Sequence, residues 1–76
     1  MGIELYYMAE LGHMTIYAAA RTAAAAEKLV YQWAEEHGFN HDVEAGSIFM
    51  EKIESNEYYR HFHYPKNNTV VLRDMP

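Results

Sequence analysis

The chain opens with an alternation of side-chain types that is typical of a β-strand. Residues 3–8 place successive side chains on opposite faces of an extended backbone. One face carries Ile3, Leu5 and Tyr7, and the other carries Glu4, Tyr6 and Met8. A turn is expected at residues 10–13, because Gly12 adopts a positive φ without steric cost. The pattern therefore predicts an opening strand that ends in a turn.

The following segment, residues 14–21, is compatible with two interpretations. Its first half, Thr15-Ile16-Tyr17, favours a strand, whereas the three alanines that follow favour a helix. In one interpretation the segment is the second strand of a hairpin, and Thr22 is the N-cap of a helix. In the other, a single helix begins near Thr15. We favour the strand, because a turn at Gly12 allows a hairpin whose small alanines lie beneath a helix.

A helix after Thr22 is predicted by apolar side chains that recur at the intervals i, i+3, i+4, i+7 and i+8. The stripe consists of Ala26, Leu29, Val30, Trp33 and Ala34. Gly38 is expected to end this helix in the left-handed conformation, with Phe39 folding back onto it as in a Schellman motif. The stripe indicates that the helix packs on a sheet, with Trp33 in the core.

Three more strands are predicted after a polar connection at residues 40–46. They are expected at residues 47–54, 57–64 and 69–73. Short turns at Ser55-Asn56 and at residues 65–68 would join them. The predicted element order is ββαβββ, which gives an α+β fold in a single domain of residues 1–76. Its antiparallel sheet would have about five strands, with one amphipathic helix on one face.

The expected strand at residues 57–64 carries aromatic side chains on both faces. One face would hold Tyr58, Arg60, Phe62 and Tyr64, and the other Tyr59, His61 and His63. One helix cannot cover both faces of such a sheet, so we expect a second layer from another chain. Tyrosine, histidine and arginine together are typical of the centres of protein interfaces. This strand is therefore the expected binding surface, with Tyr59, His61 and His63 as anchors.

Composition excludes several kinds of chemistry. The chain has 76 residues, which allows one domain and excludes the large dinucleotide-binding and TIM-barrel enzymes. It has no cysteine, which excludes disulfides, thiolate zinc sites and iron–sulfur clusters. Neither Ser47 nor Ser55 lies in a Gly-x-Ser-x-Gly motif, and the glycines stand apart rather than in a phosphate-binding run. We expect a protein that is not an enzyme and uses no cofactor.

The charge of the chain limits the classes of partner that we expect it to bind. Six basic and eleven acidic residues give a formal net charge of −5, and the basic residues are scattered, so direct binding to nucleic acid is not expected. Glu51, Glu54 and Glu57 gather near the aromatic segment. They would guide association with a basic surface of another protein. A solvated surface that keeps the chain in solution is the alternative.

The sequence contains no targeting or membrane segment that we recognise. The N-terminus lacks a basic region followed by a long apolar run, which argues against a signal peptide. The longest stretch of low polarity, residues 15–26, is interrupted by Arg21 and Thr22. We therefore expect a cytoplasmic protein that does not contact a membrane.

Histidine supplies the main alternative to a protein-binding surface. On one face of a strand, His61 and His63 would lie about 7 Å apart along the chain, which is a feasible spacing for chelating a metal. Zinc or nickel would need further ligands that converge on the same point. A histidine metal site therefore stays open beside the interface role. A homodimer or larger homo-oligomer that forms a small-molecule pocket is a further alternative.

The succession of elements also suggests a class of protein. Thr15-Ile16-Tyr17 leads through Arg21-Thr22 into an alanine-rich helix, and the expected strands at residues 48–53 and 58–64 follow. In this order the chain resembles small phage-borne inhibitors, including some anti-CRISPR proteins. The resemblance implies a non-enzymatic protein that docks on a larger host complex, often one that handles nucleic acid, and blocks it sterically. The acidic balance suits docking on a basic groove that binds nucleic acid.

Overall fold

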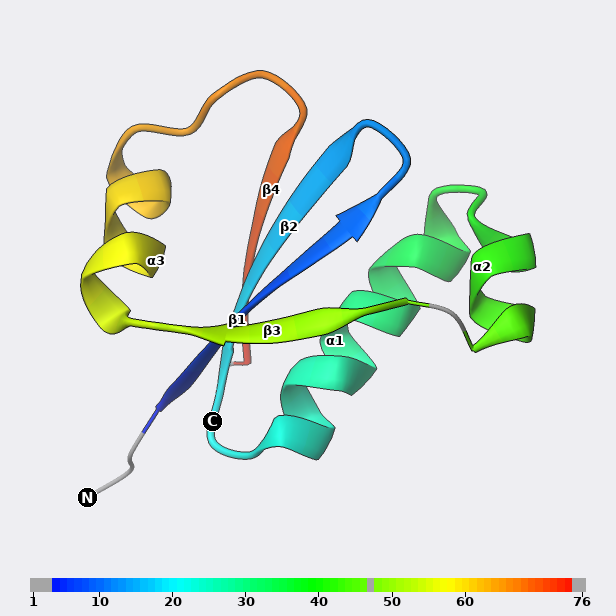
Figure 1. Cartoon of the computed structure of the whole chain (residues 1–76), viewed down its shortest axis with the longest axis horizontal. Coiled ribbons are helices and arrows are strands. Elements are labelled where there is room, and N and C mark those ends of the chain that lie inside the picture. Colours follow the sequence, from blue (N-terminus) through cyan, green and yellow to red (C-terminus); the bar gives the residue numbers. More distant parts are fainter. Residues whose placement is uncertain (1–3, 47, 75–76) are drawn as a thin grey trace.

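A four-stranded mixed sheet lies between helices in the computed structural model, which describes residues 4–46 and 48–74 (Figure 1). In chain order the elements are β1 Leu5–Leu11, β2 Met14–Ala20, α1 Ala23–Glu36, α2 Asn40–Ala45, β3 Met50–Ile53, α3 Ser55–His63 and β4 Thr69–Arg73. The sheet order is β3-β1-β2-β4, with β4 parallel to β2 and the other neighbours antiparallel. The α+β class is confirmed, but the predicted order ββαβββ and the purely antiparallel sheet are wrong.

The hairpin of β1 and β2 forms as predicted. Its register pairs Leu11 with Met14, and Gly12 in the intervening turn has a φ of 60°. Residues 14–20 are therefore strand rather than the start of the helix. The opening strand extends three residues beyond the predicted end, to Leu11, and the predicted first residue, Ile3, lies outside the described residues.

The helix α1 follows from its apolar stripe, because Ala26, Val30 and Ala34 are fully buried against the sheet. After its last turn, Gly38 adopts a φ of 88°, and the Phe39 amide donates to the Ala34 carbonyl at 2.8 Å, as expected of a Schellman-type ending. Within residues 4–46 and 48–74, no helix is both long enough and apolar enough to cross a membrane.

Replacing Thr22 by alanine is expected to lower the free energy of unfolding by about 1 kcal/mol. Thr22 is the N-cap of α1, and its Oγ1 accepts a hydrogen bond from the Ala25 amide at 3.0 Å. The Ala25 amide has no acceptor within the helix, so without the Thr22 hydroxyl it can form a hydrogen bond only with water. Urea unfolding of the Thr22→Ala and Thr22→Ser chains measures the effect. A loss as large in Thr22→Ser, which keeps the hydroxyl, would contradict the capping role.

Two segments differ from their predicted structure. Residues 40–45 form the short helix α2 instead of a polar connection, and residues 55–63 form α3 instead of a turn and a strand. In α3, Glu57 lies in the first turn, while Arg60, His61 and His63 lie in the last, which is the arrangement that the helix dipole favours. The predicted strand at 47–54 is shorter, Met50–Ile53, and Ser47 lies outside the described residues.

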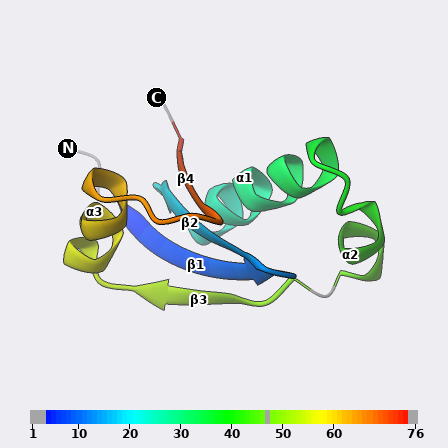
Figure 2. The same cartoon turned by 90° about the horizontal axis from the view of Figure 1, so that it is seen from above.

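The helices cover both faces of the sheet (Figure 2). Alternate residues of β1 and β2, such as Ala9 and Ile16, pack beneath α1. The intervening ones, such as Tyr17 and Ala19, pack with the fully buried Tyr58 of α3. The second layer that was expected from another chain is therefore formed, at least over part of the sheet, by this chain's own α3.

Candidate protein-binding surface

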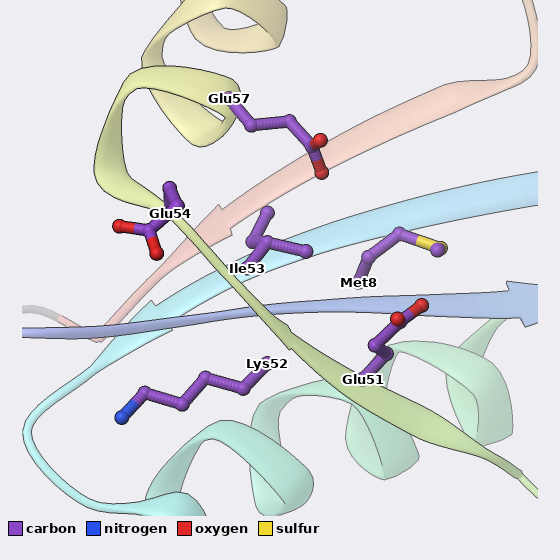
Figure 3. Close-up of a pocket in the computed structure, with 6 residues that line it drawn as sticks. All are labelled: Met8, Glu51, Lys52, Ile53, Glu54 and Glu57. Carbon is purple, nitrogen blue, oxygen red and sulfur yellow. The ribbon is translucent and has the colours of Figure 1, made fainter.

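The three glutamates predicted to steer association surround one depression of about 640 Å³ (Figure 3). Glu51 lies on β3, Glu54 directly precedes α3, and Glu57 lies in the first turn of α3. Glu54 is the single residue between β3 and α3, and the chain changes direction there. The three glutamates, each three residues from the next, therefore lie before, at and after this bend. Met8 and Ile53 supply apolar atoms to the same depression.

A second hollow of about 230 Å³ continues this surface toward the other end of β3. It is lined by Met8, Glu10, Phe49 and Glu51, so Met8 and Glu51 border both depressions. Phe49 is 76% exposed at this end. We call the combined region the acidic surface. It consists of Met8, Glu10, Phe49, Glu51, Lys52, Ile53, Glu54 and Glu57, so it holds one basic residue beside four acids.

Register explains why these residues meet. Met8 pairs with Glu51 across the β1–β3 ladder, so the two side chains lie on the same face of the sheet. Glu10 lies two residues further along β1 and therefore shares this face. Figure 3 shows the Glu51 and Glu57 carboxylates directed to the space beside Met8, whereas Lys52 extends away from it, over α1. Lys52 nevertheless belongs to the lining of the same depression, so one cationic side chain borders the carboxylates.

No ion pair neutralises the acidic surface within the described part of the chain. The ion pair found there joins Arg73, at the end of β4, to Glu4, which precedes β1, at 2.7 Å. Burial raises the pKa of Tyr17, and the charges of Glu57 and Glu10 raise that pKa further. The charge of Arg60 acts on the same hydroxyl in the opposite sense and lowers that pKa. Around the first depression three carboxylates outnumber the Lys52 ammonium, so the local charge is negative and attracts cations.

The predicted aromatic anchors do not share one face. Tyr59 is half-buried, with its ring 5.8 Å from that of Tyr6, and His63 is exposed with its ring 6.2 Å from that of Tyr59. His61 instead stacks on Tyr17 at 4.1 Å, and its buried Nδ1 has no hydrogen-bond partner among residues 4–46 and 48–74. The expectation of a shared strand face is wrong, because successive residues of a helix are rotated by about 100°.

The same rotation removes the basis for the alternative metal site. His61 and His63 are two positions apart on α3, so their side chains point in nearly opposite directions rather than along one strand face. In residues 4–46 and 48–74, no group of three or more histidine, aspartate or glutamate side chains is placed to hold a metal ion. The 7 Å spacing expected for a strand, about two residue rises, therefore does not apply.

Tyr6 gives the protein a predicted dependence of stability on alkaline pH. A side-chain hydrogen bond with Tyr59, followed by desolvation, raises the pKa of Tyr6 from 10.0 to about 12. The unfolded chain therefore releases this proton first, and stability should fall as the pH rises from 10 toward 12. Unfolding by urea across this range measures the slope. Tyr6→Phe should make it shallower, and an unchanged slope in that variant would contradict the assignment.

The acidic surface has the chemistry of a recognition site for cationic side chains. The alkyl part of a lysine or arginine can pack on Met8 and Ile53, while its charged end reaches the surrounding carboxylates. The sequence suggested Glu51, Glu54 and Glu57. It did not suggest Met8 and Glu10, which join them because β1 pairs with β3, or Phe49, which directly precedes β3. No model of a protein family matches the chain, and no match was found among curated proteins or among solved structures.

Proposed function

We propose that the chain is a non-enzymatic protein-interaction module that docks through the acidic surface on a basic surface of a larger protein. The observation that carries the proposal is that Glu51, Glu54 and Glu57 line one depression together with the apolar Met8 and Ile53. In a protein that binds nucleic acid, a basic surface contacts the phosphate backbone. Docking there would block nucleic acid sterically, as expected of a phage-type inhibitor.

The form of the surface favours a protein partner. Phe49 is 76% exposed beside the acids, and the apolar Met8 side chain is flexible enough to adapt to different contacts. Aromatic residues and methionine are enriched in the centres of protein interfaces, and polar groups surround them at the rim. The carboxylates would raise the rate of encounter, and the apolar atoms would hold the complex once it has formed.

The aromatic side of α3 provides a second area of contact. Phe62 is 48% exposed and Tyr64 is 77% exposed, and the predicted anchors Tyr59 and His63 pack around Phe62. His61 is half-buried, and its ring stacks on Tyr17 rather than on Phe62. On this side of α3 we therefore propose Tyr59 and His63 as the anchors.

Affinity capture from a cell lysate tests the proposal. The immobilised chain should recover a protein in stoichiometric amount, and that protein should bind nucleic acid on its own. The same capture with the variant Glu51→Lys/Glu54→Lys should recover much less of it. Recovery of no stoichiometric partner, or equal recovery by the variant, would overturn the proposal. Thermal unfolding of the variant establishes that it is folded.

A further inference from the structure

The strand β4 forms one margin of the sheet, and β3 forms the other. Strand β4 pairs only with β2 among the strands of the described residues, and its residues Thr69 to Leu72 are half-buried. Three of these, Val70, Val71 and Leu72, are apolar and have high strand propensity. The opposite margin is protected, since β3 has four residues with Glu51 and Lys52 in the middle. The β4 edge has no such charges at its centre.

The hydrogen bonds to β2 define which groups of β4 point outward. The Thr15 amide donates to the Asn68 carbonyl at 2.9 Å, and the Asp74 amide donates to the Ala19 carbonyl at 2.8 Å. In a parallel ladder, alternate residues of a strand bond to the same neighbour. The even-numbered residues therefore bond to β2, and the amides and carbonyls of Thr69, Val71 and Arg73 face away from the sheet. Such a row is a template for another strand.

We propose that two copies of this chain pair through β4 in antiparallel orientation, with the two-fold axis at Val71. In this register Val71 of one copy lies opposite Val71 of the other, and Thr69 lies opposite Arg73. These are the residues whose backbone groups point outward in both copies. The hydrogen-bonding pattern of an antiparallel pair is therefore satisfied without a shift or a bulge. The two sheets become one continuous sheet.

The side chains of β4 suit a second copy. Val70 and Leu72 already pack against the core beneath α1, and in this register each lies opposite the other across the axis, which extends the apolar layer. Arg73, the charged residue of β4, is paired with Glu4 and lies opposite the uncharged Thr69. No like charges meet. Such self-complementarity is a requirement of a two-fold interface.

This pairing does not depend on the proposed function. The acidic surface lies along β3, whereas the axis lies at β4, on the other margin of the sheet (Figure 2). Both acidic surfaces of the dimer therefore stay open. Two linked surfaces would bind a partner with two basic sites more tightly than one surface does.

Native mass spectrometry and sedimentation of the full chain test the pairing. We expect a species of twice the 8.9 kDa chain mass that increases with concentration. Thr69→Glu places opposite charges across the axis twice and should tighten the dimer about 2- to 30-fold, whereas Thr69→Arg places like charges there and should weaken it by a similar factor. A chain that stays monomeric, or a dimer that is indifferent to both variants, would overturn the proposal.

A cysteine at the axis provides an independent test. The chain has no cysteine, so Val71→Cys introduces a single thiol. Opposite residues of an antiparallel pair have Cα atoms about 4.5–5.5 Å apart, which is within the range of a disulfide. Mild oxidation should convert this variant to a covalent dimer much faster than Ala24→Cys, whose thiol is exposed on α1. Equal rates of covalent dimer formation for the two variants would contradict pairing at β4. Disulfide formation between the β4 thiol and a different protein, in place of a second copy, would also contradict it.

Discussion

Replacing Tyr58 by alanine is expected to lower the free energy of unfolding by about 3–5 kcal/mol. Tyr58 is fully buried and is the largest buried side chain of α3, with its ring 5.0 Å from that of Tyr6. Its hydroxyl donates a hydrogen bond to the Leu72 carbonyl at 2.9 Å. The change therefore removes the main contact of α3 with the sheet. In a domain of this size, such a loss is a large part of the total stability.

The variant Tyr58→Phe separates packing from hydrogen bonding. It keeps the ring and loses only the hydroxyl, so it should cost about 0.5–1.5 kcal/mol. Urea unfolding followed by Trp33 fluorescence measures both variants, because Trp33 lies on α1, on the other side of the sheet, and reports on the whole fold. A small effect of Tyr58→Ala, equal to that of Tyr58→Phe, would contradict the docking of α3 against the sheet.

Reversing two charges of the acidic surface is expected to slow association with the captured partner about 10- to 1,000-fold at low salt. Glu51 and Glu54 are both exposed, so Glu51→Lys/Glu54→Lys changes the charge without disturbing the core. The dissociation rate should change less, because the apolar contacts remain. Stopped-flow or surface binding at increasing ionic strength measures both rates, and the difference between the two chains should shrink as salt screens the charges.

A matched variant distinguishes a local effect from net charge. Glu35→Lys/Glu36→Lys makes the same change of charge at exposed positions of α1, on the opposite side of the sheet from Glu57. It should slow association much less than Glu51→Lys/Glu54→Lys. Equal slowing by both variants would mean that the total charge, and not the acidic surface, guides the encounter.

Local signals explain which parts of the fold could be predicted. The hairpin follows from alternation around Gly12, and α1 follows from its apolar stripe between the cap at Thr22 and the turn at Gly38. In each case the pattern, the cap and the turn residue agree. The segment 55–63 lacks this agreement. Its aromatic residues have high strand propensity, and the burial of Tyr58 against the sheet, a tertiary contact, favours the helix.

Only those residues of the candidate site that lie close together in the sequence could be predicted. Glu51, Glu54 and Glu57 are close in the sequence, so their clustering was visible, although the bend that brings them around one depression was not. Met8 and Glu10 join them because β1 pairs with β3, more than forty positions later. A single sequence gives no direct signal of such a pairing. The error over α3 also explains why His61 was expected to share a face with Tyr59 and His63, although its half-buried ring stacks on Tyr17.

Competition with nucleic acid for the captured partner tests the central claim most directly. The partner is loaded with labelled nucleic acid, and the release of the label is followed as this chain is added. The account predicts that the chain displaces the label at stoichiometric concentration, and that Glu51→Lys/Glu54→Lys fails to do so while Glu35→Lys/Glu36→Lys succeeds. A stable complex that holds the chain, the partner and the nucleic acid together would contradict it.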